Sequence, residues 1–267
     1  MRRPADAWSA AVVAARTGFA EYRALLTWRS WVFGWLLRLF SQAIFFTAFG
    51  ILLRSKTFVH YIAIGNTVML VCMEAIAVIP TLASDRFTGI RGLQLAAPTS
   101  FAFTSACRTI YCPAIGVLTS SIAFFSITRL FGVRMNFPQA AFAPAIIGVV
   151  GLATYAFGFA LACVVLTLPS LQAVVMNLSY LILMTFAGVN VPTAFWPAPV
   201  RLIAQFLPLT HGLGAIRSLV AGAPLRLVLP GVLLEAVVAG GWFAAGAAVL
   251  KSSTYVGRRT GRLELSG

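Results

Sequence analysis

Six long apolar stretches constrain the fold of this 267-residue chain more than any other feature of its sequence. Each has about 20 residues or more, the length that a helix needs to cross roughly 30 Å of hydrocarbon. Because the stretches are continuously apolar rather than alternating, they predict helices and exclude a transmembrane β-barrel. We therefore expect an all-α integral membrane protein with six transmembrane helices, at Trp31–Leu53, Tyr61–Ala83, Thr109–Phe131, Ala141–Leu168, Leu171–Val191 and Leu227–Leu250.

The charged residues are few, and their distribution predicts the orientation in the membrane. Only 10% of the residues are charged, whereas soluble domains have about a quarter, so an ordinary soluble protein is excluded. With six spans both termini lie on one side, and that side receives thirteen of the twenty cations. By the positive-inside rule, we expect cytoplasmic termini in a multi-pass protein of the inner (plasma) membrane. We therefore attribute the net charge of +14 to cations that set the membrane orientation and contact lipid headgroups, rather than to nucleic-acid binding.

The first 30 residues predict a helix that lies along the membrane surface on the cytoplasmic side. Apolar residues recur there at intervals of three or four, as on one helical face, and basic residues fall elsewhere on the wheel. Such a helix places its cations near lipid phosphates, although a disordered basic tail is the alternative. Residues 31–250 would form the six-span domain and residues 251–267 a basic cytoplasmic tail. The apolar face consists of Trp8, Val12, Ala15, Phe19, Tyr22 and Leu26.

Prolines interrupt the apolar segment of roughly thirty-five residues that lies between Val191 and the last span. Proline removes a backbone donor and breaks helices, so a span cannot run through this segment. We expect two short helices, near Val200–Leu207 and His211–Ala221, in a re-entrant segment that dips into the outer leaflet. Backbone of this kind is tolerated at membrane depth only when protein buries it or when it lines a cavity.

Two glutamates are the only carboxylates within the predicted spans, Glu74 and Glu235. Charged groups at membrane depth normally face the bundle interior or an aqueous cavity, so a structural ion pair or hydrogen bond is the favoured interpretation. Both also lie on the candidate substrate path, together with Phe45 and Phe49 of the phenylalanine-rich first span. The last span has a face of small residues suited to close helix packing, within the bundle or between subunits: Ala236, Gly240, Gly241, Ala244, Ala245 and Ala248.

The sequence offers no candidate for catalysis, metal binding or nucleotide binding. His60 and His211 lack partners at ligand spacing, and the four cysteines are scattered without a metal-binding pattern. The run Gly50–Thr57 approaches a phosphate-binding loop, but Ser55 replaces its second glycine and a membrane helix precedes it. We therefore expect neither an enzyme nor a cofactor site in this chain.

The polar run Ser84–Gly92 is the one internal loop that concentrates charge. Its Asp85-Arg86 start, Gly89, and Pro98 nine residues later resemble the first cytoplasmic loop of type-2 ABC exporter permeases. The proline-broken segment with its Leu-Pro-Leu-Thr motif and Arg217 resembles the outer segment of the same family. The resemblance covers nearly the whole chain, although only these two segments are specific. The candidate outer gate consists of Asn190, Pro192, Pro208, Leu209, Thr210 and His211.

This resemblance implies transport driven by ATP hydrolysis in a separate partner subunit. The loop would form a coupling helix that docks on a separate ABC ATPase subunit, which holds ATP and Mg²⁺, and two permeases, identical or related, would form the transporter. Family members often carry a glutamate three residues after the loop glycine, where this chain has Gly92. This replacement would weaken or redirect the ATPase contact. The residues expected at the ATPase are Asp85, Arg86, Gly89, Arg91, Gly92 and Pro98.

The sequence leaves the transported compound open. Among the permeases that this chain resembles, those with short loops commonly export hydrophobic small molecules, so the resemblance implies a drug, an antibiotic or a lipid. Others move lipid-linked glycans through aromatic-lined channels, and the phenylalanines of the first span keep that alternative open. A different class of function is an ATP-independent carrier that uses Glu74 or Glu235. A third is a membrane anchor or sensor that transports nothing.

Overall fold

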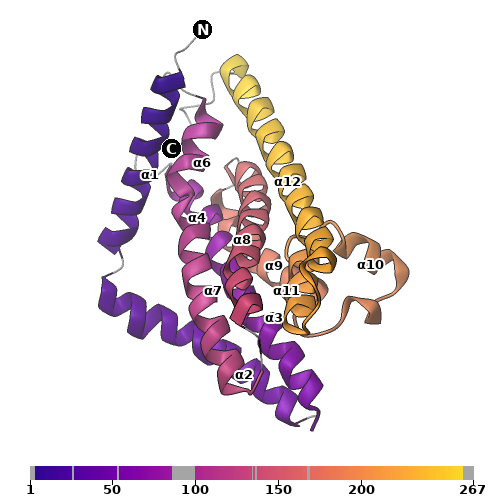
Figure 1. Cartoon of the computed structure of the whole chain (residues 1–267). Helices are drawn as coiled ribbons and strands as arrows, with labels where there is room; N and C mark the ends of the chain where they lie inside the picture. The colour runs from indigo at the N-terminus through magenta and orange to yellow at the C-terminus, as the bar shows by residue number, and fades with distance from the viewer. Residues whose placement is uncertain are drawn as a thin grey trace.

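The computed structural model describes residues 4–25, 27–52, 54–85, 100–133, 135, 137–166 and 169–260. This part of the chain is all-helical, as the sequence predicts, and contains no strand. The helices form a bundle in which the start of α1 (Pro4–Leu25) and the end of α12 (Leu225–Thr260) lie at the same end (Figure 1).

Within the described residues, five helical segments are long and apolar enough to cross a membrane. Two of them are interrupted just before a proline: Pro80 lies four residues after the break at Ile76, and Pro113 four residues after Thr109. Because proline has no N–H, neither can donate to the carbonyl four residues earlier, and the helix breaks there. The five segments are η1 and α2 (Ser30–Leu36 and Leu37–Leu52), α3 and α4 (Lys56–Ala75 and Val78–Ser84), α6 and α7 (Phe101–Thr109 and Tyr111–Leu130), α8 (Phe137–Val165) and α12.

The fifth predicted span is a shorter helix than expected. It corresponds to α9, Gln172–Phe186, which has 15 residues and is therefore about 22 Å long, below the roughly 30 Å of the hydrocarbon core. The short 3₁₀ helix η2, Pro169–Leu171, precedes it, and Gly188 follows it with a φ of 85°, which glycine adopts readily. Five spans are thus supported by length and composition, and a sixth crossing at α9 stays a prediction.

Both short helices that were predicted before the last span are present. They are α10 (Ala198–Ala204) and α11 (Thr210–Val220), and the 3₁₀ turn η3 (Thr193–Phe195) precedes them. Their prolines occupy the positions where a missing N–H is tolerated: Pro192 caps η3 and Pro197 caps α10. The segment therefore folds as predicted locally, while its depth in the membrane remains a prediction.

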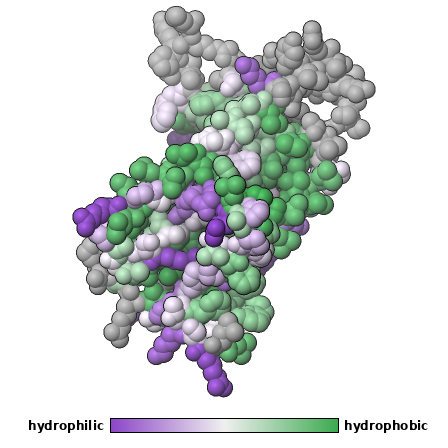
Figure 2. All heavy atoms as spheres, turned by 90° about the vertical axis from the view of Figure 1, so that its right-hand side faces the viewer, coloured by the Kyte–Doolittle hydropathy of each residue, from purple (hydrophilic) through white to green (hydrophobic). Residues whose placement is uncertain are grey.

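Burial separates the inner helices from the outer ones. In an 18-residue apolar stretch of each segment, the buried share is 89% for α3–α4 and 78% for α8, but only 22% for η1–α2 and 11% for α12. Helix α12 packs on α8, and α3 packs on α7 and α2. Figure 2 shows broad hydrophobic patches on one outer face, as expected for helices that meet lipid or a second subunit.

The small-residue face of the last span does not pack within the bundle, which was one of its two predicted roles. All six of its residues are exposed, so they do not pack within the bundle. The close approach to α8 occurs instead at Gly246, where an added Cβ would lie 3.0 Å from the Cα of Ala160. Packing of the small-residue face between subunits stays a prediction.

Candidate functional site

A buried cation lies at the base of the predicted coupling loop. Arg108 of α6 is 4% exposed and donates to two carboxylates, Asp85 Oδ1 and Glu21 Oε2. Asp85 immediately follows α4 and is itself buried, while Glu21 belongs to α1 and is half-exposed. We call these three residues the loop-base cluster. It joins the two chain segments that flank residues 86–99 to the N-terminal helix.

The electrostatics of the loop-base cluster make its charges interdependent. Burial raises the pKa of Asp85 above its ordinary value, and the guanidinium of Arg108 counteracts that effect. Removal of one partner from a buried ion pair leaves an uncompensated charge, which costs about 3–5 kcal/mol. Arg108 is therefore needed to keep the start of the loop in place.

Gly18 allows α1 to pack closely against the loop-base cluster. A Cβ added at Gly18 would lie 1.9 Å from the carbonyl oxygen of Arg108, so only glycine allows the two helices to approach this closely. Ala14, one turn earlier, is also buried. In contrast, Trp8 and Phe19 of the predicted apolar face are exposed. Val12, Ala15 and Tyr22 of the same face are half-buried. The face is therefore only partly open, and the neighbouring Ala14–Gly18 edge packs on α6.

The remaining residues predicted to meet the ATPase lie outside the described part of the chain. They are Arg86, Gly89, Arg91, Gly92 and Pro98. Helix α6 begins directly after the loop, where the hydroxyl of Ser100 accepts a hydrogen bond from the Phe103 N–H at 3.3 Å. The described residues therefore fix both ends of the loop.

At the opposite end of the bundle, Arg217 holds the turn that follows α9. Its guanidinium donates to the carbonyls of Gly188 at 2.8 Å and of Val189 and Tyr61 at 3.1 Å. It also lies over the ring of Tyr61, 3.4 Å from the ring centroid, as in a cation–π interaction. The two ends of the predicted outer segment are thereby brought together on α3.

Two further contacts attach this turn to α3. The Asn66 side chain donates to Asn190 Oδ1 at 2.8 Å, and the Tyr61 hydroxyl donates to the Gly188 carbonyl at 2.8 Å. An added Cβ at Gly65 would lie 2.2 Å from the Val189 carbonyl oxygen, so this glycine allows the close approach. Sequence reasoning identified Asn190 but missed its partners on α3, because hydropathy alone does not say which helix faces the turn.

Glu235 caps α11 from the neighbouring helix α12. Its side chain is fully buried, and its two carboxylate oxygens accept from the backbone N–H of Leu209 at 2.6 Å and of Gly212 at 2.8 Å. A helix N-terminus has unpaired N–H groups and a partial positive charge, so a carboxylate is well placed there. These bonds also hold Leu209 in its unusual backbone conformation, with a φ of 81°.

The other candidate gate residues are fixed by backbone contacts. The Thr210 hydroxyl donates to the Ala204 carbonyl at 2.7 Å, and His211 Nε2 lies 2.9 Å from the Gln205 carbonyl oxygen. Pro208 precedes the strained Leu209. The Leu-Pro-Leu-Thr motif therefore forms the tight joint between α10 and α11.

The candidate substrate-path residues do not line one common site within this chain. Glu74 is 5% exposed and accepts a hydrogen bond from Trp35 Nε1. Phe45 and Phe49 are exposed on α2 and contact each other edge to face, with ring centroids 5.1 Å apart. Both glutamates thus have structural hydrogen bonds, and a substrate contact at any of these residues stays a prediction. Among the described residues, no three His, Cys, Asp or Glu side chains gather into a metal site.

Comparison with known families agrees with this arrangement. The family model for the ABC-2 type transporter matches residues 20–220. The chain belongs to this family. Neither a curated protein nor a solved structure matches it. The matched region of this ABC-2 permease extends from the loop-base cluster to the end of α11, so it contains both segments that carried the resemblance.

Proposed function

We propose that this chain is the membrane subunit of an ATP-driven exporter, coupled through residues 84–100 to a separate ATPase subunit. The loop-base cluster is the observation that carries this proposal. Its ion pairs join the start of the loop to α6 and α1, so the loop has a rigid base on helices α4, α6 and α1. A force applied to the loop would pass through Asp85 and Arg108 to α4, α6 and α1. ATP and Mg²⁺ would be held by the ATPase subunit.

The proposed assembly contains two permeases and two ATPases. The exposed faces of α2 and α12 are suited to a second copy or a related permease, and Phe45 and Phe49 would then lie near the path between the subunits. In this arrangement α9 completes six spans, the α10–α11 segment re-enters the outer leaflet, and both termini are cytoplasmic. The favoured cargo is a hydrophobic small molecule, and the exposed phenylalanines keep a lipid-linked glycan as the alternative.

The carrier hypothesis receives less support from the geometry. Proton-coupled carriers use chains of ionisable groups that face a cavity. Here Glu235 is committed to the N-terminus of α11 and Glu74 to Trp35. We therefore place both glutamates in the structure of the bundle rather than in proton transfer.

Co-purification with an ATPase subunit encoded in a neighbouring reading frame tests the proposal. The permease is expected to bind this subunit and to make its ATP hydrolysis responsive to hydrophobic compounds. Gly89→Trp and Arg86→Ala should each weaken association by about 2 kcal/mol, roughly thirtyfold in Kd, as for residues central to an interface.

Arg54→Ala is the matched control for Arg86→Ala, because Arg54 is an exposed cation in the α2–α3 turn. It should leave association unchanged. Intact assembly and transport in both loop variants would refute coupling through this loop. Transport without any ATPase, together with loss of transport in Glu74→Gln, would favour the carrier.

A further inference from the structure

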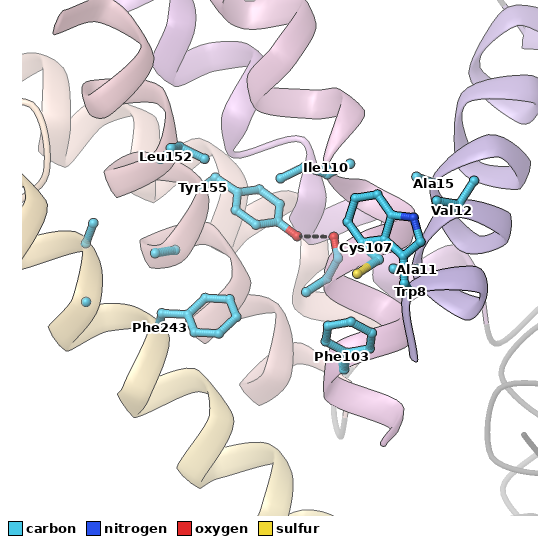
Figure 3. A pocket seen from close by; sticks show the side chains of 14 residues that line it. Trp8, Ala11, Val12, Ala15, Phe103, Cys107, Ile110, Leu152, Tyr155 and Phe243 are labelled. Atoms are coloured by element: carbon cyan, nitrogen blue, oxygen red, sulfur yellow. Dashed lines mark hydrogen bonds between the residues drawn. The ribbon is translucent and has the colours of Figure 1, made fainter. Parts of the chain in front are cut away.

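A wide apolar groove lies between α1 and the end of the bundle formed by α6, α8 and α12. Its volume is about 710 Å³. Figure 3 shows aromatic side chains from all four helices around it, with Trp8 and Phe103 facing Tyr155 and Phe243. We call it the α1–α12 groove. The other lining residues are Ala11, Val12, Ala15, Ala106, Cys107, Ile110, Leu152, Ala156, Ala239 and Gly240.

The groove is lined by aliphatic and aromatic side chains. The Tyr155 hydroxyl is already used, because it donates to the Ala106 carbonyl at 2.9 Å (Figure 3). It also lies 2.7 Å from the Thr109 hydroxyl. Gly240 leaves open space, since an added Cβ there meets no atom within 4 Å. An alkyl chain fits this chemistry, whereas a polar group would lose its hydrogen bonds.

Cations border the same face of α1. Arg16 follows the groove residue Val12 by one turn and lies beside the apolar face of the helix, and Arg23 lies two turns further along the same side. Both are exposed. The helix also carries Asp6 and Glu21, and the Glu21 carboxylate is directed to Arg108. The groove therefore combines an apolar interior with a basic edge.

We propose that the α1–α12 groove binds an acyl chain of an anionic phospholipid from the leaflet that contains α1, with the lipid phosphate near Arg16 and Arg23. Each cation near an anionic surface favours binding by about fivefold. This lipid is distinct from the transported compound and adds to the contacts that hold α1 against the bundle.

The charges favour a lipid over a second copy of the chain. Four acidic residues, Glu21, Glu74, Asp85 and Glu235, are bonded within their own chain: Glu21 and Asp85 to Arg108, Glu74 to Trp35, and Glu235 to backbone N–H groups. A second copy has a net charge of +14 and would be repelled by the basic edge, whereas an anionic headgroup is attracted to it.

Native mass spectrometry of the detergent-purified permease tests this proposal, with phosphatidylglycerol and phosphatidylcholine of identical acyl chains as probes. We expect phosphatidylglycerol to be retained preferentially. Gly240→Leu should fill the groove, and displacement of about two methylene groups weakens retention roughly tenfold. Gly241→Leu is the matched control, because Gly241 is equally open but does not line the groove. Replacement of both arginines, Arg16→Gln with Arg23→Gln, should remove the preference between the lipids.

Several outcomes would overturn the proposal. Equal retention in Gly240→Leu and Gly241→Leu would place the lipid elsewhere, and equal retention of both lipids by the unaltered protein would exclude recognition of the headgroup. Oxidation that links two copies through Cys107 would show that a second chain occupies the groove. Displacement of the lipid by a compound that stimulates the ATPase would identify a substrate route instead. Ala239→Leu, on the same wall, provides a second test if Gly240→Leu unfolds.

Discussion

Substitution of Glu235 distinguishes a structural cap from a proton carrier. Alanine at this position leaves the N–H groups of Leu209 and Gly212 without their acceptors in a site that is fully buried. Each buried unpaired donor costs about 1–3 kcal/mol, so Glu235→Ala should destabilise the permease by about 2–6 kcal/mol. Glutamine keeps one acceptor oxygen, and Glu235→Gln should therefore cost about half as much.

Thermal unfolding in detergent measures this difference. For a chain of this size 1 kcal/mol corresponds to about 2–4 °C in Tm, so Glu235→Ala should lower Tm by roughly 4–24 °C and Glu235→Gln by less. Leu234→Ala, at the exposed neighbouring position on α12, controls for the helix itself. A Glu235→Gln protein with unchanged Tm and no transport would refute the structural assignment and favour a carrier.

Two further predictions concern the buried arginines. Arg108→Met should destabilise the bundle by about 3–5 kcal/mol because it removes the cation of a buried ion pair. Addition of Asp85→Asn should restore part of the Tm, and no recovery would show that the ion pair does not hold the loop base. Arg217→Lys should cost about 2 kcal/mol, because an ammonium cannot span the three carbonyls that the guanidinium contacts. The exposed Arg201 on α10 provides the control substitution for Tm, and equal effects of Arg217→Lys and Arg201→Lys would contradict this assignment.

Hydropathy and proline placement predicted most of the secondary structure. In lipid the backbone must bond within its own segment, so a long apolar run has helix as its main solution, and five of the six predicted runs have the length of a span. Proline acts locally, and the short helices α10 and α11 therefore lie close to the predicted positions. The length of α9 was overestimated, because apolar residues continue past Phe186 although the helix ends before Gly188.

The sequence by itself therefore determined the class of protein, its helices and the family-like spacing around Gly89 and Pro98. Tertiary structure alone decided the partners of the charged residues. Arg108 meets Glu21 from 87 positions earlier, and Arg217 meets the backbone of Tyr61 from 156 positions earlier. Such pairs depend on which helix faces which, and an apolar run has no periodic signal that fixes its neighbour. For the same reason, the groove beneath α1 emerged only from the packed bundle.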